Sequence, residues 1–526
     1  MIGKKELKEI LHNRFKDDSC KKAGDIPLPS ELKDNYKAAK RIKKAVEEKE
    51  NIIIVGDYDV DGIVSSVILT HFLQRVGAKF DVKIPNRFTE GYGLNSTIID
   101  NLPANTNLII TVDNGISADE AAICCQKRGI ELIITDHHQP PSKLPIAFAI
   151  INPKQQECHF PNSEICGAQV AWYLVGALKD VFGINYDMSK SLDILLLAII
   201  ADMMELRDMN RVLTRLGLEH LNRSKRACFR AIREYYGKSK FGFDDISFLI
   251  APLINSTGRM DDATLSYKFL SSTDIRKANG YLDEIISINN SRKEEEKNLY
   301  EDSILNVDED DSIIVAWGKE WHEGVIGIVA SRLCKQYKKP AIVFSIDDDR
   351  AKGSARSVGR FDILKAIEDN RELLIGYGGH RSAAGIVIDP SNLMKFKEAL
   401  NSQISKEDII ASTNYKDEIL GELNLDELDL EMLDILEFFE PYGQKNPRPT
   451  FILKDLKVLL IRTIGKDQNH LKMTLKKGGT IKEALFFNFD VRPKENDYIT
   501  IIATITKNEF KKMISPELII KEIVSH

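Results

Sequence analysis

The fold of this chain follows from one stretch, Asn51-Ile52-Ile53-Ile54-Val55-Gly56-Asp57-Tyr58-Asp59-Val60-Asp61-Gly62. Four β-branched residues in a row are typical of a strand that is buried on both faces. Aspartates then follow at alternate positions, Asp57, Asp59 and Asp61. Because carboxylates this close repel one another, the pattern favours a divalent cation between them, although a solvated acidic turn would explain this cluster taken by itself.

An EF-hand calcium loop opens with the same residues, Asp57, Asp59, Asp61 and Gly62. That loop requires a glutamate at its twelfth position, where this chain has Ile68. It also requires a helix before it, where this chain has a predicted strand. The EF-hand interpretation is therefore excluded.

Two more apolar segments end in residues that can bind a metal. Residues 107–112 lead into Asp113, and residues 131–135 lead into Asp136-His137-His138. In an open parallel sheet, ligands bind at the carboxyl ends of the strands, so these side chains are predicted to surround one cavity. Taken singly, each aspartate could cap a helix and the histidines could be surface residues. Together they favour a metal site with oxygen and imidazole ligands, which suits Mn²⁺ or Mg²⁺ better than zinc.

These motifs resemble those of the DHH phosphoesterase superfamily and, within it, the RecJ family of single-strand-specific exonucleases. The resemblance extends from about residue 50 to 520. It implies an enzyme that degrades single-stranded DNA from 5′ to 3′, releasing 5′-mononucleotides during recombination and repair, with two Mn²⁺ or Mg²⁺ ions. The expected metal ligands are Asp59, Asp61, Asp113, Asp136, His137 and Asp202, the last of which ends the apolar run 194–201 and would otherwise be a helix cap.

Two further residues are expected to be catalytic, Asp57 as a ligand or water-positioning base and His138 as a ligand, orienting group or acid. Many DHH proteins have a histidine where this chain has Val55, so the identity of the first ligand stays open.

The resemblance also implies the domain order. We expect an α/β protein with an N-terminal helical segment (1–50), a parallel-sheet DHH domain (51–260), a long linker helix (261–306), a second α/β domain of the DHHA1 type (307–405) and a C-terminal OB-like β-barrel (415–526). Five short strands are predicted in the barrel, at 451–453, 458–461, 471–475, 484–487 and 500–504. In the turn before them, Lys445 stands where the family usually has glycine.

The predicted substrate-binding residues lie in glycine-rich or basic segments. They are Arg87, Arg259, Ser354, Arg356, Gly379 and His380. Arg87 could hold a phosphate or pair with Glu90. Paired glycines allow close approach to a ligand, although tight turns use them too.

The net charge of −6 does not suggest a nucleic-acid-binding protein. Basic residues nevertheless gather from residue 453 to residue 482, opposed by Asp455 and Asp467. They are Lys454, Lys457, Arg462, Lys466, Lys472, Lys476, Lys477 and Lys482. This patch fits single-stranded DNA, or else a solubilising β-surface.

Other partners and the location of the protein are also expectations. We expect a monomer that interacts with single-strand-binding protein and a helicase. Seven cysteines without a CxxC pair, no signal peptide and no apolar run of about 20 residues predict a cytoplasmic protein with no membrane span.

Two rival functions remain open at this point. A DHH-DHHA1 phosphodiesterase for short oligonucleotides or cyclic dinucleotides would typically lack the barrel. A non-enzymatic single-strand-binding scaffold would have lost its metal ligands, whereas the recognisable aspartates and histidines are present here.

Overall fold

The computed structural model describes residues 1–308, 310–405, 409, 419–465, 468–489, 491–510 and 513–525. The chain forms two compact units. The first consists of Leu28–Asp202 and His220–Asn414, and the second of Met1–Pro27, Met203–Glu219 and Tyr415–His526. The predicted start of the barrel domain, residue 415, lies outside the described residues. Within the described part of the chain, no helix is both long and apolar enough to cross a membrane.

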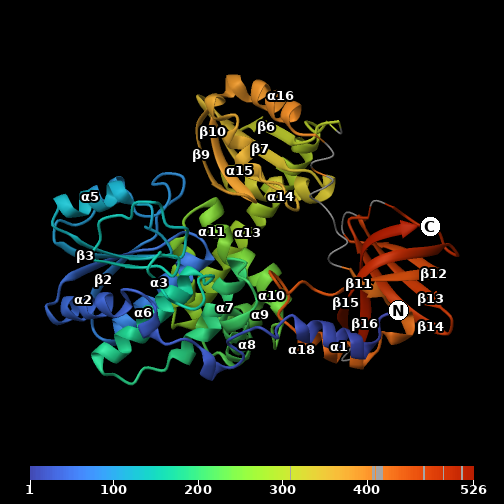
Figure 1. The fold of residues 1–526 in the computed structure, drawn as a ribbon, viewed down its shortest axis with the longest axis horizontal. Coiled ribbons are helices and arrows are strands. Elements are labelled where there is room, and N and C mark those ends of the chain that lie inside the picture. Colours follow the sequence, from blue (N-terminus) through green and yellow to red (C-terminus); the bar gives the residue numbers. More distant parts are fainter. Residues whose placement is uncertain are drawn as a thin grey trace. The chain divides into compact units, whose positions relative to one another are not determined.

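The first unit contains the predicted parallel sheet, in the strand order β2-β1-β3-β4-β5 (Figure 1). Every neighbouring pair in this sheet is parallel. Side chains alternate between the two faces of β1, and Ile52, Ile53, Ile54 and Val55 are all at most 4% exposed. The expected strand buried on both faces is confirmed. The strands are β1 (Asn51–Val55), β2 (Lys79–Lys83), β3 (Thr106–Val112), β4 (Glu131–Thr135) and β5 (Ala149–Ile151).

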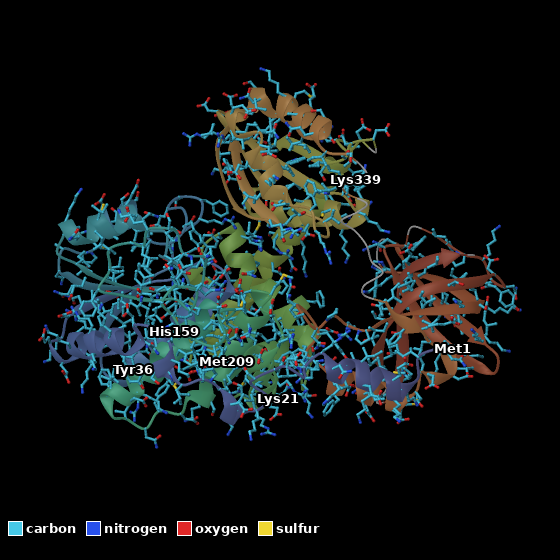
Figure 2. The ribbon with its side chains drawn as sticks, in the orientation of Figure 1. Met1, Lys21, Tyr36, His159, Met209 and Lys339 are labelled. Carbon is cyan, nitrogen blue, oxygen red and sulfur yellow. The ribbon has the colours of Figure 1, made fainter. Side chains whose placement is uncertain are left out.

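Helices cover both faces of this sheet. Ile53 and Val55 pack against α4 and α5. Helices α2, α3 and α6 pack together on the other side of the sheet from α5 (Figure 1). The hydroxyl of Tyr36 on α2, labelled in Figure 2, donates a hydrogen bond to Asp180 of α6 at 2.6 Å. The helices are α2 (Asn35–Glu47), α3 (Val60–Arg75), α4 (Ser96–Asp100), α5 (Asp119–Lys127), α6 (Gly167–Phe182) and α7 (Leu192–Ala201).

A run of helices connects this sheet to a second one. It comprises α8 (Asp208–Arg223), which has residues of both units, α9 (Ala227–Tyr236), α10 (Phe243–Asp245), a π-helical turn (Ile246–Ile250), α11 (Ala251–Met260), α12 (Thr264–Ser271) and α13 (Ile275–Ile304). The predicted linker helix is therefore interrupted before Asp274, whose side chain caps α13 by accepting a hydrogen bond from the Arg276 amide.

The second sheet of this unit is mixed, in the order β6-β7-β8-β10-β9, and β6 and β7 are parallel. Helix α14 packs on one face, and α15 and α16 pack on the other. The elements are β6 (Ile314–Lys319), α14 (Glu323–Tyr337), β7 (Ala341–Asp347), β8 (Arg350–Arg356), α15 (Ile363–Glu368), β9 (Leu374–His380), β10 (Ala383–Ile388) and α16 (Leu393–Gln403). The second α/β domain is confirmed.

The second unit is built on a barrel in the strand order β11-β12-β13-β14-β16-β15, which the pairing of β12 with β15 closes. The first two predicted strands are one long strand, β12, with a register shift between Leu453 and Leu456. The last strand, β16, was not predicted. The strands are β11 (Ile419–Glu422), β12 (Thr450–Ile464), β13 (His470–Lys477), β14 (Thr480–Phe487), β15 (Tyr498–Phe510) and β16 (Met513–Ser525).

Helices α1 (Lys4–Asn13) and α18 (Leu430–Phe438) cover the barrel core. Leu7 and Leu11 are fully buried in it, and the amide of Ile2 donates to the carbonyl of Glu422 at 2.7 Å. The predicted N-terminal segment is therefore divided between the two units. Lys445 takes the left-handed conformation, with φ of 60°, that a glycine would adopt without strain.

Candidate metal centre and phosphate cleft

Three neighbouring parallel strands bring acidic residues to one edge of the sheet. The backbone hydrogen bonds of the sheet continue for one residue past the ends of β3 and β4. The amide of Asp113 donates to the carbonyl of Thr135 at 2.9 Å, and that of Asp136 donates to Ile151 at 3.0 Å. Both aspartates are thereby fixed where the sequence predicts them, beside the turn that carries Asp57.

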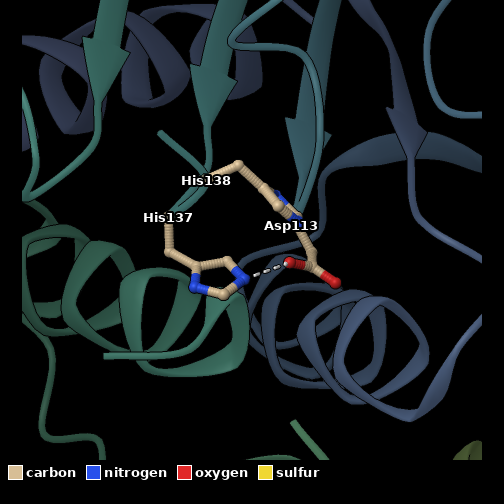
Figure 3. Close-up of side chains that lie close together, drawn as sticks. All are labelled: Asp113, His137 and His138. Carbon is tan, nitrogen blue, oxygen red and sulfur yellow. Dashed lines mark ion pairs between the residues drawn. The ribbon is translucent and has the colours of Figure 1, made fainter. Parts of the chain in front are cut away.

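The imidazole of His137 lies at the centre of the acidic cluster. Its Nε2 atom is 3.2 Å from Asp113 Oδ1, 3.5 Å from Asp202 Oδ2 and 3.7 Å from Asp61 Oδ2. Figure 3 shows His137 pointing toward Asp113. Three predicted ligands from separate parts of the chain therefore surround one nitrogen atom of a fourth, His137.

The potential ligand atoms form three overlapping sets. Within each set the atoms lie within 4.8 Å of one another. The sets are Asp113-His137-His138, Asp61-His137-Asp202 and Asp57-Asp59-Asp113. His137 belongs to two of them and Asp113 to two, so the sets are adjacent. This is an arrangement that two neighbouring cations could share.

Protonation equilibria in the cluster are strongly shifted. Burial, followed by the charges of Asp61 and Asp59, holds the pKa of Asp113 well above its usual range. Burial and the same two neighbours raise the pKa of Asp202 to about 9. Burial lowers the pKa of His137 to about 4, so its ring is neutral near pH 7. Ionising the carboxylates of this cluster is therefore energetically unfavourable without a cation, and a bound cation would remove this penalty.

Unsatisfied atoms in the cluster also fit a cation. Asp113 Oδ1, Asp202 Oδ2 and His137 Nδ1 are buried and have no hydrogen-bond partner among the described residues. Carboxylate oxygens with a neutral imidazole are a donor set suited to Mn²⁺ or Mg²⁺.

The start of helix α6 supports the cluster. Both carboxylate oxygens of Asp61 accept hydrogen bonds, one from the amide of Gly167 at 2.6 Å and the other from that of Ala168 at 2.7 Å. A Cβ atom at residue 167 would lie 2.4 Å from Asp113 Oδ1, so only glycine allows this approach. Sequence reasoning missed Gly167, and its signal is a glycine at the first position of a helix.

Asp136 differs from the other predicted ligands, because hydrogen bonds occupy both of its oxygens. Oδ2 accepts from the amide of Ile116 at 2.9 Å, and Oδ1 lies 2.7 Å from Nδ1 of the half-exposed His138. Asp136 is in none of the three sets. Burial lowers the pKa of His138, but the hydrogen bond to Asp136 outweighs it and raises that pKa to about 9. The geometry favours Asp136 as the group that orients His138.

Asp202 directly follows α7, at a helix C-terminus. A carboxylate is unfavourable there, because the helix dipole places partial negative charge at that end. The backbone of Asp202 forms the C-cap of α7, and the short distance of its side chain to His137 also agrees with the metal-ligand interpretation.

A cleft of about 540 Å³ contains four predicted substrate-binding residues, Arg87, Arg259, Ser354 and Arg356. The guanidinium of Arg87 stacks 5.0 Å from the ring centre of Tyr58. Glu90 pairs with Lys83 at 2.5 Å, so the alternative in which Arg87 pairs with Glu90 is not observed.

The arginines of this cleft repel one another. Burial, followed by Arg87, Arg292 and Arg356, lowers the pKa of Arg259 to about 10. Among the described residues, no carboxylate lies within ion-pair distance of Arg87, Arg259 or Arg356, whereas Arg356 donates to Ser354 Oγ at 2.9 Å. Unpaired guanidinium groups in a cleft are typical of a phosphate site.

Two predicted residues do not line the cleft. Gly379 and His380 lie on β9, and two other glycines of that strand, Gly376 and Gly378, line the cleft instead.

The sequence analysis also missed Tyr92, whose ring centre is 6.0 Å from that of Tyr58.

The predicted basic patch on the barrel is partly neutralised. Lys454 pairs with Glu422 at 2.8 Å, and Lys472 pairs with Glu483 at 3.4 Å. Within the described residues, no carboxylate is within ion-pair distance of the five other members, Lys457, Arg462, Lys476, Lys477 and Lys482. Lys466 and Asp467 lie outside the described residues.

Models of three protein families match this chain. The DHH family, N-terminal domain, matches residues 51–199, the DHHA1 domain matches 310–406 and the RecJ OB domain matches 419–522.

Several curated proteins are similar over most of their length. The single-stranded-DNA-specific exonuclease RecJ of Haemophilus influenzae is 32% identical over 494 residues, which cover 88% of this chain and 85% of that protein. The protein of the same name from Escherichia coli is 30% identical, with 93% and 89% covered. The Bacillus subtilis protein is 32% identical over 95% of this chain, which spans only 64% of that longer relative.

A solved structure also resembles this chain. RecJ from Thermus thermophilus in complex with Mn²⁺ superposes with a TM-score of 0.79 at 25% identity, covering 94% of this chain and 72% of that one.

Proposed function

Because this chain belongs to the RecJ family of single-stranded-DNA-specific exonucleases, we propose that it hydrolyses single-stranded DNA from the 5′ end and releases 5′-mononucleotides. The observation that carries this proposal is the convergence of Asp61, Asp113, His137 and Asp202 within a few ångströms, beside Asp57 and Asp59. The role in recombination and repair follows from the family.

Asp59, Asp61, Asp113, His137 and Asp202 would hold two Mn²⁺ or Mg²⁺ ions, and Asp57 and His138 lie beside them. When bound, the ions supply charge neutralisation at the phosphoryl group and activation of a water molecule. Asp57 positions that water. The two amides at the start of α6 orient the carboxylate of Asp61 and favour its ionised form, whereas burial raises its pKa.

His138 acts on the leaving group. Asp136 holds its ring through Nδ1, which leaves Nε2 as the exposed nitrogen. The hydrogen bond to Asp136 raises the pKa of His138 in the metal-free site, which favours the protonated ring that a proton donor to the departing oxygen requires.

The cleft lined by Arg87, Arg259, Ser354 and Arg356 binds phosphates of the strand. Arg87 and Arg259 come from the first α/β domain, and Ser354 and Arg356 come from the second. A strand held by both would therefore have a fixed position relative to the metal centre, which favours cleavage at one distance from the anchored phosphate.

The barrel also binds single-stranded DNA. Lys457, Arg462, Lys476 and Lys482 supply the charge, and exposed rings such as Phe487, 47% exposed, supply stacking surface. We also propose that the protein is a cytoplasmic monomer, recruited by single-strand-binding protein and a helicase.

A labelled long single strand tests the function. With Mn²⁺, a 5′ label is expected to appear first in mononucleotides, and Asp113→Ala should abolish the reaction. Asp100→Ala, at an exposed position at the end of α4, is the matched control and should be as active as the unaltered chain.

Other outcomes would favour the rival functions. A strand that is bound but stays intact with every divalent metal would identify a scaffold. Cleavage restricted to short oligonucleotides would identify a small-substrate phosphodiesterase.

A further inference from the structure

Helix α11 packs directly on the turn that carries the first aspartates. The side-chain oxygen of Asn255 accepts a hydrogen bond from the amide of Val60 at 3.0 Å. A Cβ atom at Gly258 would lie 2.3 Å from the carbonyl oxygen of Tyr58, so the two backbones touch. Nothing in the sequence analysis assigned a role to Asn255 or Gly258.

The hydrogen bond from Val60 has a specific place in the turn. Val60 is the first residue of α3, so its amide has no partner within the helix. The neighbouring Asp59 side chain already accepts from the amide of Gly62 at 3.1 Å. Asn255 therefore satisfies an amide that lies between Asp59 and Asp61, from outside the turn.

We propose that Asn255 is a positioning residue of the metal centre. By holding the amide of Val60, it fixes the directions in which the carboxylates of Asp57 and Asp59 leave the turn. The inference rests on the proposed two-metal function, and it adds a residue that does not touch metal or substrate.

The same helix links the metal centre to the phosphate cleft. Arg259 lies one helical turn after Asn255, on the same side of α11, and lines the cleft. Its carbonyl oxygen is so close to the start of α14 that a Cβ atom at Gly324 would lie 1.7 Å from it. A shift of α11 would therefore move the arginine and the metal-binding turn together.

Binding of Mn²⁺ to the full chain, measured by isothermal titration calorimetry after chelation of bound metal, tests this role without using activity. Asn255→Ala is expected to weaken Mn²⁺ binding about tenfold, the loss typical for groups that orient metal ligands. Asn255→Asp keeps the acceptor oxygen and should bind Mn²⁺ as tightly as the unaltered chain.

Ser256→Ala is the matched control. Its hydroxyl donates to Leu253 within α11 at 2.7 Å and does not reach the turn, so Mn²⁺ affinity should not change. Circular dichroism verifies that each variant is folded.

Unchanged affinity in Asn255→Ala would overturn the inference. Equal losses in Asn255→Asp and Asn255→Ala would overturn it too, because the acceptor oxygen would then be irrelevant. If Asn255→Ala does not fold, Asn255→Leu decides, because it has a similar volume and no acceptor oxygen: a tenfold loss supports the role and native affinity refutes it. Absence of Mn²⁺ binding by the unaltered chain would instead refute the proposed function.

Discussion

Replacing Asp202 with asparagine should stabilise the protein in the absence of metal and weaken its binding of metal. Potential ligand atoms of Asp202 and Asp61 lie within 4.8 Å of each other. At that distance two ionised carboxylates repel by about 3 kcal/mol, with an effective dielectric constant of about 20. The asparagine side chain would keep the shape of the aspartate and remove the repulsion, so the free energy of unfolding should rise by about this amount once pH exceeds the folded-state pKa of Asp202, about 9.

The gain in the free energy of unfolding should increase with pH. In the folded protein the pKa of Asp202 is about 9, raised from 3.8 by burial and then by Asp61 and Asp59. The folded state therefore holds this proton more tightly than the unfolded state, and stability is lost as pH rises from about 4 to about 9. The variant has no such titration, so its advantage should grow across this window.

Scanning calorimetry with EDTA at pH 7 and pH 9 measures the effect, and repetition with Mn²⁺ should reverse the order of the two proteins. Asp369→Asn is the matched control, because Asp369 also follows a helix directly but is exposed and outside the cluster. If Asp202→Asn is no more stable than the unaltered chain in EDTA at pH 9, the carboxylates do not repel and the cation argument fails.

Three further predictions concern other parts of the molecule. Burial, followed by Arg226, lowers the pKa of His71 from 6.5 to about 4, so about 3 kcal/mol of stability should be lost as pH falls from about 6.5 to about 4. The variant His71→Gln should lose less stability between pH 7.5 and pH 4.5, as measured by urea unfolding at both values. Gly167→Ala places Cβ 2.4 Å from Asp113 Oδ1 and should weaken Mn²⁺ binding at least about tenfold by calorimetry, and unchanged affinity would refute the close approach. Leu7→Ala, at a fully buried position, should lower the stability of the barrel unit by about 2–5 kcal/mol in thermal unfolding, and a smaller loss than about 1 kcal/mol would contradict the packing of α1.

The site was predictable where local sequence and sheet geometry act together. Strands at 51–55, 107–112 and 131–135 are apolar and lead into aspartates, and parallel strands gather their carboxyl ends at one edge. That reasoning was sufficient to predict that Asp113 and His137 lie close together at this edge of the sheet. Asp202 required the family resemblance, because a carboxylate after a helix has the same local pattern whether it caps or binds metal.

Tertiary contacts explain what the sequence did not predict. The preference for Asp136 as an orienting group depends on the amide of Ile116, which arrives from another segment. Strand β16 contains Pro516, which argues against a strand in sequence reasoning, yet Pro516 pairs opposite Lys507 in the barrel. The fusion of two predicted strands into β12 depends on a β-bulge between Leu453 and Leu456, in which Asp455 takes the left-handed conformation with φ of 55°.

The contact between the first helix and the barrel has a consequence for synthesis of the chain. Leu7 and Leu11 leave the ribosome first, but the core that buries them needs strands as late as β16. At about 5–20 residues per second, the roughly 500 intervening residues take about 25–100 s to be made. During that interval the apolar face of α1 is not covered by the barrel core. A chain that ends after the second α/β domain would therefore keep this face exposed. A chain that begins at Leu28 lacks α1 and has no such exposed face.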